Sequence, residues 1–166
     1  MATVVQQLDM GAAQFLSSAF PQMVKNGTNF PAIGLAYDAA AAEAAFWMTR
    51  AVSYGSGNVT VACDWYADTA TSGDVIWGCQ LAAITPDADT QDVETKSLAT
   101  ANTVTDTHLG TTGQRLHRAS ITVSNLDSLA NNDDVWIRIY RDAAAGGDTM
   151  TGDAVLVGVT VSYSDT

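Results

Sequence analysis

The last third of the chain alternates its side chains with a period of two, and this pattern constrains the fold more than any other feature. Val155, Val157, Val159, Val161 and Tyr163 fall on one side of the final segment, opposite smaller or more polar residues. A period of two is typical of a β-strand with one face against a core. Two similar segments precede it, joined by turns rich in Gly, Asp and Asn, and no catalytic motif accompanies them. The pattern predicts an all-β fold without indicating a reaction.

Comparable segments recur from about Phe30 onwards, with regular turn signals and no alternating helices. They predict an all-β fold: a single eight-stranded antiparallel sandwich, jelly-roll-like, with an immunoglobulin-like sandwich as the alternative. A chain of 166 residues, 47% of them hydrophobic, can build such a core as one domain. The core is expected to contain Val59, Val61, Trp65, Val75, Trp77, Leu81, Ile121, Val123, Val135, Ile137, Ile139, Val155, Val157, Val159 and Val161.

Residues 1–29 lack this alternation and are predicted to form an N-terminal arm or strap, leaving 30–166 as the β-sandwich. Four apolar side chains in the segment need cover: Phe15, Leu16, Phe20 and Met23. Burying each is worth roughly 1.5–3 kcal/mol. We expect the arm to reach a neighbouring subunit of a homo-oligomer, with a trimer as the expected form. The alternative is that it folds back across its own sandwich.

The formal net charge is −11, from seven Lys and Arg against eighteen Asp and Glu. Such a chain is repelled by phosphate backbones and anionic lipids, so neither nucleic acid nor a membrane is an expected partner. The N-terminus has no basic segment followed by an unbroken apolar run, as a secretory signal would require. The protein is therefore expected to be made in a cytoplasm.

The two cysteines are the most specific local feature. If residues 58–67 and 74–84 form a hairpin centred on Thr71, Cys63 lies opposite Cys79. The two readings are a cross-strand disulfide and a pair of buried thiols. The thiols are favoured, because cysteines on adjacent strands bridge only with strain and a cytoplasm keeps them reduced. Two cysteines alone do not make a zinc site, which needs about four ligands.

Other candidate sites are read as structural. One loop carries Asp87, Asp89, Asp92 and Glu94, and a second carries 131–134, but neither has the spacing of a known calcium loop. His117 has only arginines near it in sequence, and neither a nucleophile elbow nor a phosphate-binding glycine loop is present. The sequence therefore predicts no enzyme activity, no metal and no cofactor.

The aromatic residues raise one functional possibility. Exposed aromatic side chains on a sandwich can stack on sugar rings, which favours a carbohydrate-binding module. Most of the tryptophans are at strand positions predicted to point into the core. Trp136 and Tyr140 are instead on the side of their strand opposite its aliphatic face, with Arg138 between them. Such a face fits a subunit contact as easily as a glycan platform.

Three stretches carry a resemblance to a known family: 116–123 (LHRASITV), 135–142 (VWIRIYRD) and 148–154 (DTMTGDA) leading to 161–165 (VSYSD). They resemble the C-terminal part of small β-sandwich proteins encoded in the virion modules of tailed bacteriophages and prophages. The likeness covers roughly residues 30–166. These are packing motifs and supply no functional residues.

The resemblance implies a non-enzymatic structural virion protein, best matched by a jelly-roll capsid decoration (cement) protein that stabilises a phage capsid lattice. Its partners would be copies of itself, as a trimer, and the major capsid protein, and its location the virion. The alternatives are a carbohydrate-binding module and a tail or head-fibre receptor-binding domain. The interface candidates are Phe15, Leu16, Phe20, Met23, Trp136, Arg138 and Tyr140.

Overall fold

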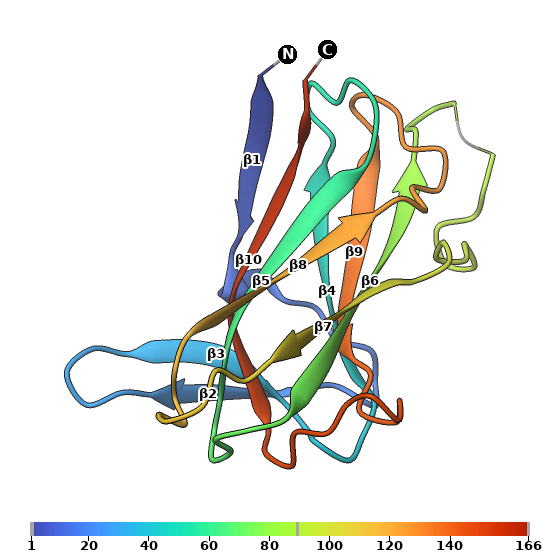
Figure 1. Ribbon diagram of the computed structural model, residues 1–166. Coiled ribbons are helices and arrows are strands. Elements are labelled where there is room, and N and C mark those ends of the chain that lie inside the picture. Colours follow the sequence, from blue (N-terminus) through green and yellow to red (C-terminus); the bar gives the residue numbers. More distant parts are fainter. Residues whose placement is uncertain (1, 89, 166) are drawn as a thin grey trace.

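The computed structural model describes residues 2–88 and 90–165 and shows a sandwich of two antiparallel sheets (Figure 1). Within these residues there are ten strands and one short 3-10 turn, η1 (Met10–Ala12), and none of the helical structure could cross a membrane. The first sheet contains β1 (Thr3–Leu8), β2 (Gln22–Asn26), β3 (Ala32–Tyr37), β5 (Val59–Ala67), β8 (His117–Val123) and β10 (Ala154–Ser164). The second contains β4 (Glu43–Arg50), β6 (Asp74–Ile84), β7 (Asn102–Thr107) and β9 (Asp134–Arg141). The prediction of an all-β antiparallel sandwich is confirmed.

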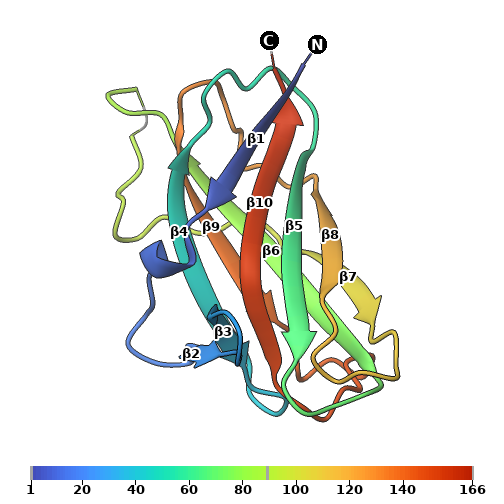
Figure 2. The same ribbon diagram turned by 90° about the vertical axis from the view of Figure 1, so that its left-hand side faces the viewer.

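Strand β10 organises the first sheet, whose order is β2-β3-β10-β5-β8. One of its sides is shared by two strands: β3 pairs with Ala154–Leu156, and β1 pairs with the later part, from Val159 to Ser164. The two ends of the chain therefore lie side by side at one end of the sandwich (Figures 1 and 2). The second sheet has the order β4-β9-β6-β7 and faces the first across the core.

Residues 1–29 contain two strands that the missing alternation did not predict, so the structure has ten strands among the described residues where eight were expected. Both β1 and β2 pair along their whole length with the first sheet. Both strands are short and carry many exposed side chains, so hydrophobic alternation does not reveal them. The residues between them, 9–21, form a strap that lies along β4 of the same chain. Gln14 exchanges two backbone hydrogen bonds with Phe46, at 2.8 and 2.9 Å, and Ala44 N–H donates to the Ala19 carbonyl.

The core contains all the predicted residues except Val155 and Val157, both of which lie in β10. A β-bulge between Leu156 and Gly158 shifts the phase of the strand. As a result Ala154 and Leu156 point into the core, while Val157 is only half-buried on the outer face. An unbroken period of two cannot reveal such a slip, because one extra residue exchanges the two faces of a strand.

A buried ion pair fixes the loop that leads into β10. Arg141 and Asp148 have side-chain exposures of 0% and 1%, and they form two hydrogen bonds of 2.7 and 3.0 Å. The guanidinium also donates to the carbonyls of Gly152 and Met150, and the carboxylate accepts the N–H of Ile76. Every partner of this pair is therefore inside the protein, where its charges are not solvated by water.

Two histidines hold the turn that follows β7. His108 and His117 lie with ring centroids 4.7 Å apart, and His117 stacks on Trp65 at 4.6 Å. Leu109 N–H donates to Nε2 of His117, and Gly110 N–H donates to Nδ1 of His108. Both rings accept a backbone hydrogen bond, so protonation at either of these nitrogens breaks it. Burial lowers the pKa of His117, as does the neighbouring His108, whereas Asp106 acts in the opposite direction.

We expect the free energy of unfolding to fall as the pH is lowered from about 7 to about 5. The unfolded chain, with a histidine pKa of about 6.5, takes up a proton before His117 does in the folded state. A His117→Gln variant can accept the Leu109 N–H without titrating and should show a shallower pH dependence. Urea denaturation at a series of pH values measures both. Equal slopes for the two proteins would contradict the assignment.

Candidate functional site

The cysteines do not form the predicted hairpin pair. The chain crosses from the first sheet to the second between β5 and β6, so Cys63 pairs in register with Val159 and Ala119, and Cys79 with Ile139 and Asn102. Both are buried free thiols. Burial raises the pKa of Cys79 to about 12 and that of Cys63 well above its ordinary value. Thiols in this state are poor nucleophiles and poor metal ligands.

The acidic loops serve the fold. Asp92 accepts the Glu94 N–H through its side chain and the Lys96 N–H through its carbonyl, and buried Asp133 accepts from Thr85 and Ala130. Asp89 lies outside the described residues. Among the residues that the structure describes, no three His, Cys, Asp or Glu side chains are grouped as metal ligands.

The outer face of the second sheet carries the residues of greatest interest. Its registers place side chains in rows across β4, β9 and β6. Trp136 is half-buried and lies between Met48 and the small residue Ala82. The next row is Phe46, Arg138 and Gln80, and the third is Ala44, Tyr140 and Gly78.

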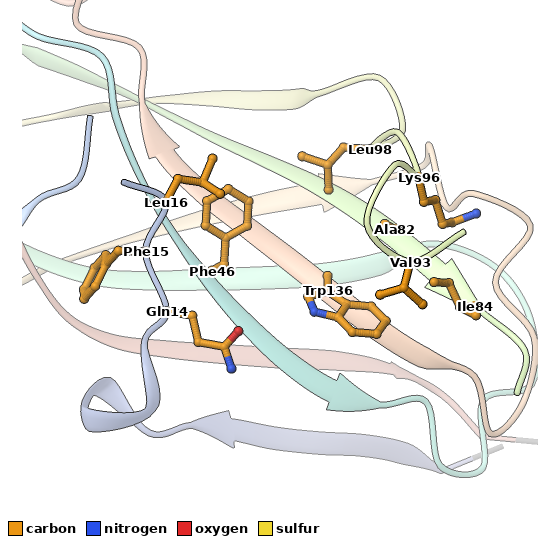
Figure 3. Close-up of a pocket in the computed structure, with 10 residues that line it drawn as sticks. All are labelled: Gln14, Phe15, Leu16, Phe46, Ala82, Ile84, Val93, Lys96, Leu98 and Trp136. Carbon is orange, nitrogen blue, oxygen red and sulfur yellow. The ribbon is translucent and has the colours of Figure 1, made fainter. Parts of the chain in front are cut away.

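A groove of about 360 Å³ runs across this face at the first of these rows, and we call it the Trp136 groove. Figure 3 shows Trp136 near its centre, with residues of the strap on the β4 side and residues of the 91–98 loop on the β6 side. Both walls and most of the floor are apolar. Its ten lining residues are Gln14, Phe15, Leu16, Phe46, Ala82, Ile84, Val93, Lys96, Leu98 and Trp136.

Hydrogen bonds hold both walls in place. The strap is fixed at Gln14 by its backbone pairing with Phe46. On the other side, the Lys96 ammonium points away from Trp136 (Figure 3) and pairs with Asp127 at 3.0 Å, while Gln80 donates to the Ala99 carbonyl at 2.9 Å. The groove is therefore formed before any ligand arrives, which lowers the entropy lost on binding.

The polar end of the face is built around Tyr140. At Gly78 the space that a Cβ would occupy is filled by the Tyr140 ring, so the ring lies directly on the backbone of β6. The guanidinium of Arg138 lies over this ring at 4.5 Å from its centroid and donates to Oε1 of Gln80. Burial raises the pKa of Tyr140, which keeps its hydroxyl neutral.

The structure brings together most of the predicted interface residues. Phe15, Leu16 and Trp136 line the groove, Phe20 contacts Phe15 with ring centroids 5.6 Å apart, and Arg138 and Tyr140 occupy the same sheet face. Met23 does not belong to the group, because it lies on β2 in the other sheet. Sequence reasoning missed Phe46 and the loop residues Val93, Lys96 and Leu98. The position of Phe46, one residue before the buried Trp47, was the available signal for an outward side chain.

A second groove of about 620 Å³ lies beside the β2–β3 hairpin, which projects from the body of the sandwich in Figure 1. It is larger, but neither of its aromatic rings lies on an open sheet face between two walls: Tyr66 is buried, and Phe30 belongs to the hairpin loop. Phe30 is 74% exposed near the hairpin tip, and the Tyr66 hydroxyl is already bonded to Asn26 at 2.8 Å. We therefore take the Trp136 groove as the candidate site.

Comparison with known proteins connects the fold to one group of structures. No protein-family model and no curated protein matches the chain. Among solved structures, it is similar to CBM28, a non-crystalline cellulose specific carbohydrate-binding module, with 14% identity, a TM-score of 0.53 and coverage of 89% of this chain and 85% of that one. It is also similar to the xylan-binding module CBM15, with 13% identity, a TM-score of 0.51 and coverage of 99% of both chains. Identities this low establish the shared sandwich fold alone.

These structural relatives correct the prediction of a capsid decoration protein. They are carbohydrate-binding modules and not phage virion proteins, so that prediction is wrong. The sequence stretches that suggested a virion protein are now seen as the core strands β8, β9 and β10 with the loop before the last. Alternating core strands of this kind occur in sandwiches of unrelated function, so they carry information about packing and little about activity.

Proposed function

We propose that this protein is a non-enzymatic carbohydrate-binding module that holds a polysaccharide chain in the Trp136 groove. The observation that carries the proposal is the indole of Trp136 on the floor of an open apolar groove with fixed walls. The C–H face of a sugar ring is apolar and packs on an aromatic ring, while the hydroxyls at its edge need polar partners. Gln14 lines the groove, and Gln80 and Arg138 lie in the next row of the same face.

The composition of the groove supports binding without bond cleavage. Hydrolysis of a glycosidic bond needs two carboxyl groups that flank it, roughly 5–9.5 Å apart. None of the described residues that line the groove is Asp or Glu. The two similar structures are a module specific for non-crystalline cellulose and a xylan-binding module, which supports polysaccharides of these types as the first ligands to test.

Replacing Trp136 with Ala should weaken binding to the preferred polysaccharide by roughly thirtyfold, as expected for a central aromatic contact worth about 2 kcal/mol. Affinity electrophoresis in gels containing soluble cellulose derivatives or xylan measures the loss. Met23→Ala is the matched control, because Met23 is an exposed apolar side chain on the other sheet. The proposal would be refuted if no polysaccharide retarded the migration of the wild-type protein in the gel. It would also be refuted if the Trp136 variant were retarded as much as the wild-type protein.

Self-association is a separate question. The strap bonds to β4 of its own chain, whereas Leu16 remains 66% exposed at the rim of the groove. The homo-oligomer expected from the sequence stays a prediction, which sedimentation equilibrium of the wild-type protein can measure.

A further inference from the structure

The cations of this acidic protein are mostly neutralised by carboxylates, and the exceptions are informative. Four of the seven Lys and Arg residues form ion pairs, leaving Lys25, Arg115 and Arg138 without one among the described residues. Lys25 and Arg115 are exposed to water, which solvates them. Arg138 is half-buried on the face that carries the Trp136 groove. The four pairs are Arg50–Asp134, Lys96–Asp127, Arg118–Asp64 and Arg141–Asp148.

The neighbours of Arg138 use only part of its hydrogen-bonding capacity. Its side chain donates to one neutral oxygen, Oε1 of Gln80, although a guanidinium has five N–H donors. The chain contains eighteen Asp and Glu, yet no carboxylate of the described residues lies within ion-pair distance of it. A half-buried guanidinium with unused donors beside a binding groove is a ready partner for an anionic group on a ligand.

The geometry of the site also suits one kind of anion. Gly78 allows the Tyr140 ring to lie on β6, and the guanidinium lies over that ring. Contact with the aromatic ring and the bond to Gln80 limit the rotation of a long side chain, so less entropy is lost when a ligand binds. A planar guanidinium held in this way matches a carboxylate, which it can bind through two parallel hydrogen bonds.

We propose that Arg138 recognises a carboxylate on the bound polysaccharide, so that the preferred ligand is a chain bearing uronic acid groups. This inference rests on the proposed function of the Trp136 groove, since Arg138 lies in the next row of the same sheet face. The net charge of −11 repels densely charged polyanions. It is compatible with isolated carboxylates on an otherwise neutral chain, because salt screens charges more than about 10 Å away.

The test compares two forms of one polymer: glucuronoxylan, and the same glucuronoxylan after chemical reduction of its carboxyl groups. The wild-type protein should bind the intact polymer at least about tenfold more tightly than the reduced one, as expected for a charge-assisted contact. Arg138→Gln should abolish this preference by weakening binding to the intact polymer alone. Arg138→Lys should retain part of it, since a lysine keeps the charge but not the planar pair of donors.

Lys25→Gln is the matched control. It removes the same charge from an exposed position on the first sheet and should retain the full preference. Equal affinity of the wild-type protein for both polymers, with both lost in Trp136→Ala, would refute the role of Arg138 and leave the proposed function intact. Equal weakening of both polymers by Arg138→Gln would also refute it, because Arg138 would then only shape the groove. If the wild-type protein bound neither these polymers nor any neutral one, the proposed function would fail as well.

Discussion

Replacing Asp148 with Ala should lower the free energy of unfolding by about 3–5 kcal/mol, because it leaves the charge of Arg141 buried without its counterion. Arg141 is completely buried, and its remaining partners are neutral carbonyl oxygens. The substitution also removes the acceptor of the Ile76 N–H, one of several hydrogen bonds that join the 142–153 loop to β6. Urea denaturation of the purified variant measures the loss.

The exposed pair between Arg50 and Asp134 provides the control. Arg50 is largely open to water, so Asp134→Ala should destabilise the protein far less. A double variant, Arg141→Met with Asp148→Leu, should recover part of the loss from Asp148→Ala, because an apolar pair needs no counterion. Recovery is incomplete because the Ile76 N–H and the carbonyls of Met150 and Gly152 are then left without these side-chain partners. Similar losses for Asp148→Ala and Asp134→Ala would show that the buried pair has no special role.

Trp65→Ala should also lower the free energy of unfolding by about 3–5 kcal/mol, the usual range for removing a large aromatic side chain from a core. Trp65 is fully buried, packs near Trp77 with ring centroids 6.3 Å apart and stacks on His117. Its indole N–H donates to Asp106 on β7 at 2.8 Å. The residue therefore connects the two sheets by packing and by a hydrogen bond.

A comparison of two phenylalanine variants separates these contributions. Trp65→Phe removes a hydrogen bond, whereas the indole nitrogen of Trp77 has no partner in the described part of the chain. Trp65→Phe and Trp77→Phe shrink a fully buried ring by a similar amount, but only Trp65→Phe loses a hydrogen bond. Trp65→Phe should therefore be the more destabilising of the two by about 1 kcal/mol. Equal losses in urea denaturation would show that the bond to Asp106 adds nothing.

The strands that the sequence revealed are those with one face in the core. Val135, Ile137 and Ile139 alternate with half-buried residues along β9, and the buried residues of β8 alternate with exposed ones. Burial on one face imposes the period of two directly, so fold class and most core residues could be predicted. Strands β1 and β2 could not, because their stability comes from backbone pairing with β10 and β3 and their side chains are largely exposed.

The pairing of strands far apart in sequence could not be predicted from the alternation of side chains. Strands β5 and β6 alternate well and are separated by a short turn, which favoured a hairpin. The two strands instead join different sheets, because β5 pairs with β10 and β6 pairs with β9. The local sequence of two strands does not state which third strand pairs with them, and the predicted position of Cys63 opposite Cys79 failed for this reason.

Individual residues of the site could be predicted, but their assembly into a groove could not. Trp136, Arg138 and Tyr140 alternate with core residues of β9, so their outward direction followed from the period of two. The walls depend on contacts between residues far apart in sequence, such as Gln14 with Phe46 and Lys96 with Asp127. Neither contact leaves a local signal, so the groove itself became visible only in the structure.

Carbohydrate binding at Trp136 can be observed directly by NMR titration of the four tryptophan indole N–H resonances with soluble xylo- and cello-oligosaccharides. Trp47, Trp65 and Trp77 are buried in the core, and Trp136 alone lies in the groove. We expect the Trp136 resonance to shift in a saturable manner while the other three remain nearly fixed. A Trp136 resonance that stays unchanged at saturating concentrations of every oligosaccharide, or saturable shifts confined to residues around the β2–β3 hairpin, would contradict this expectation.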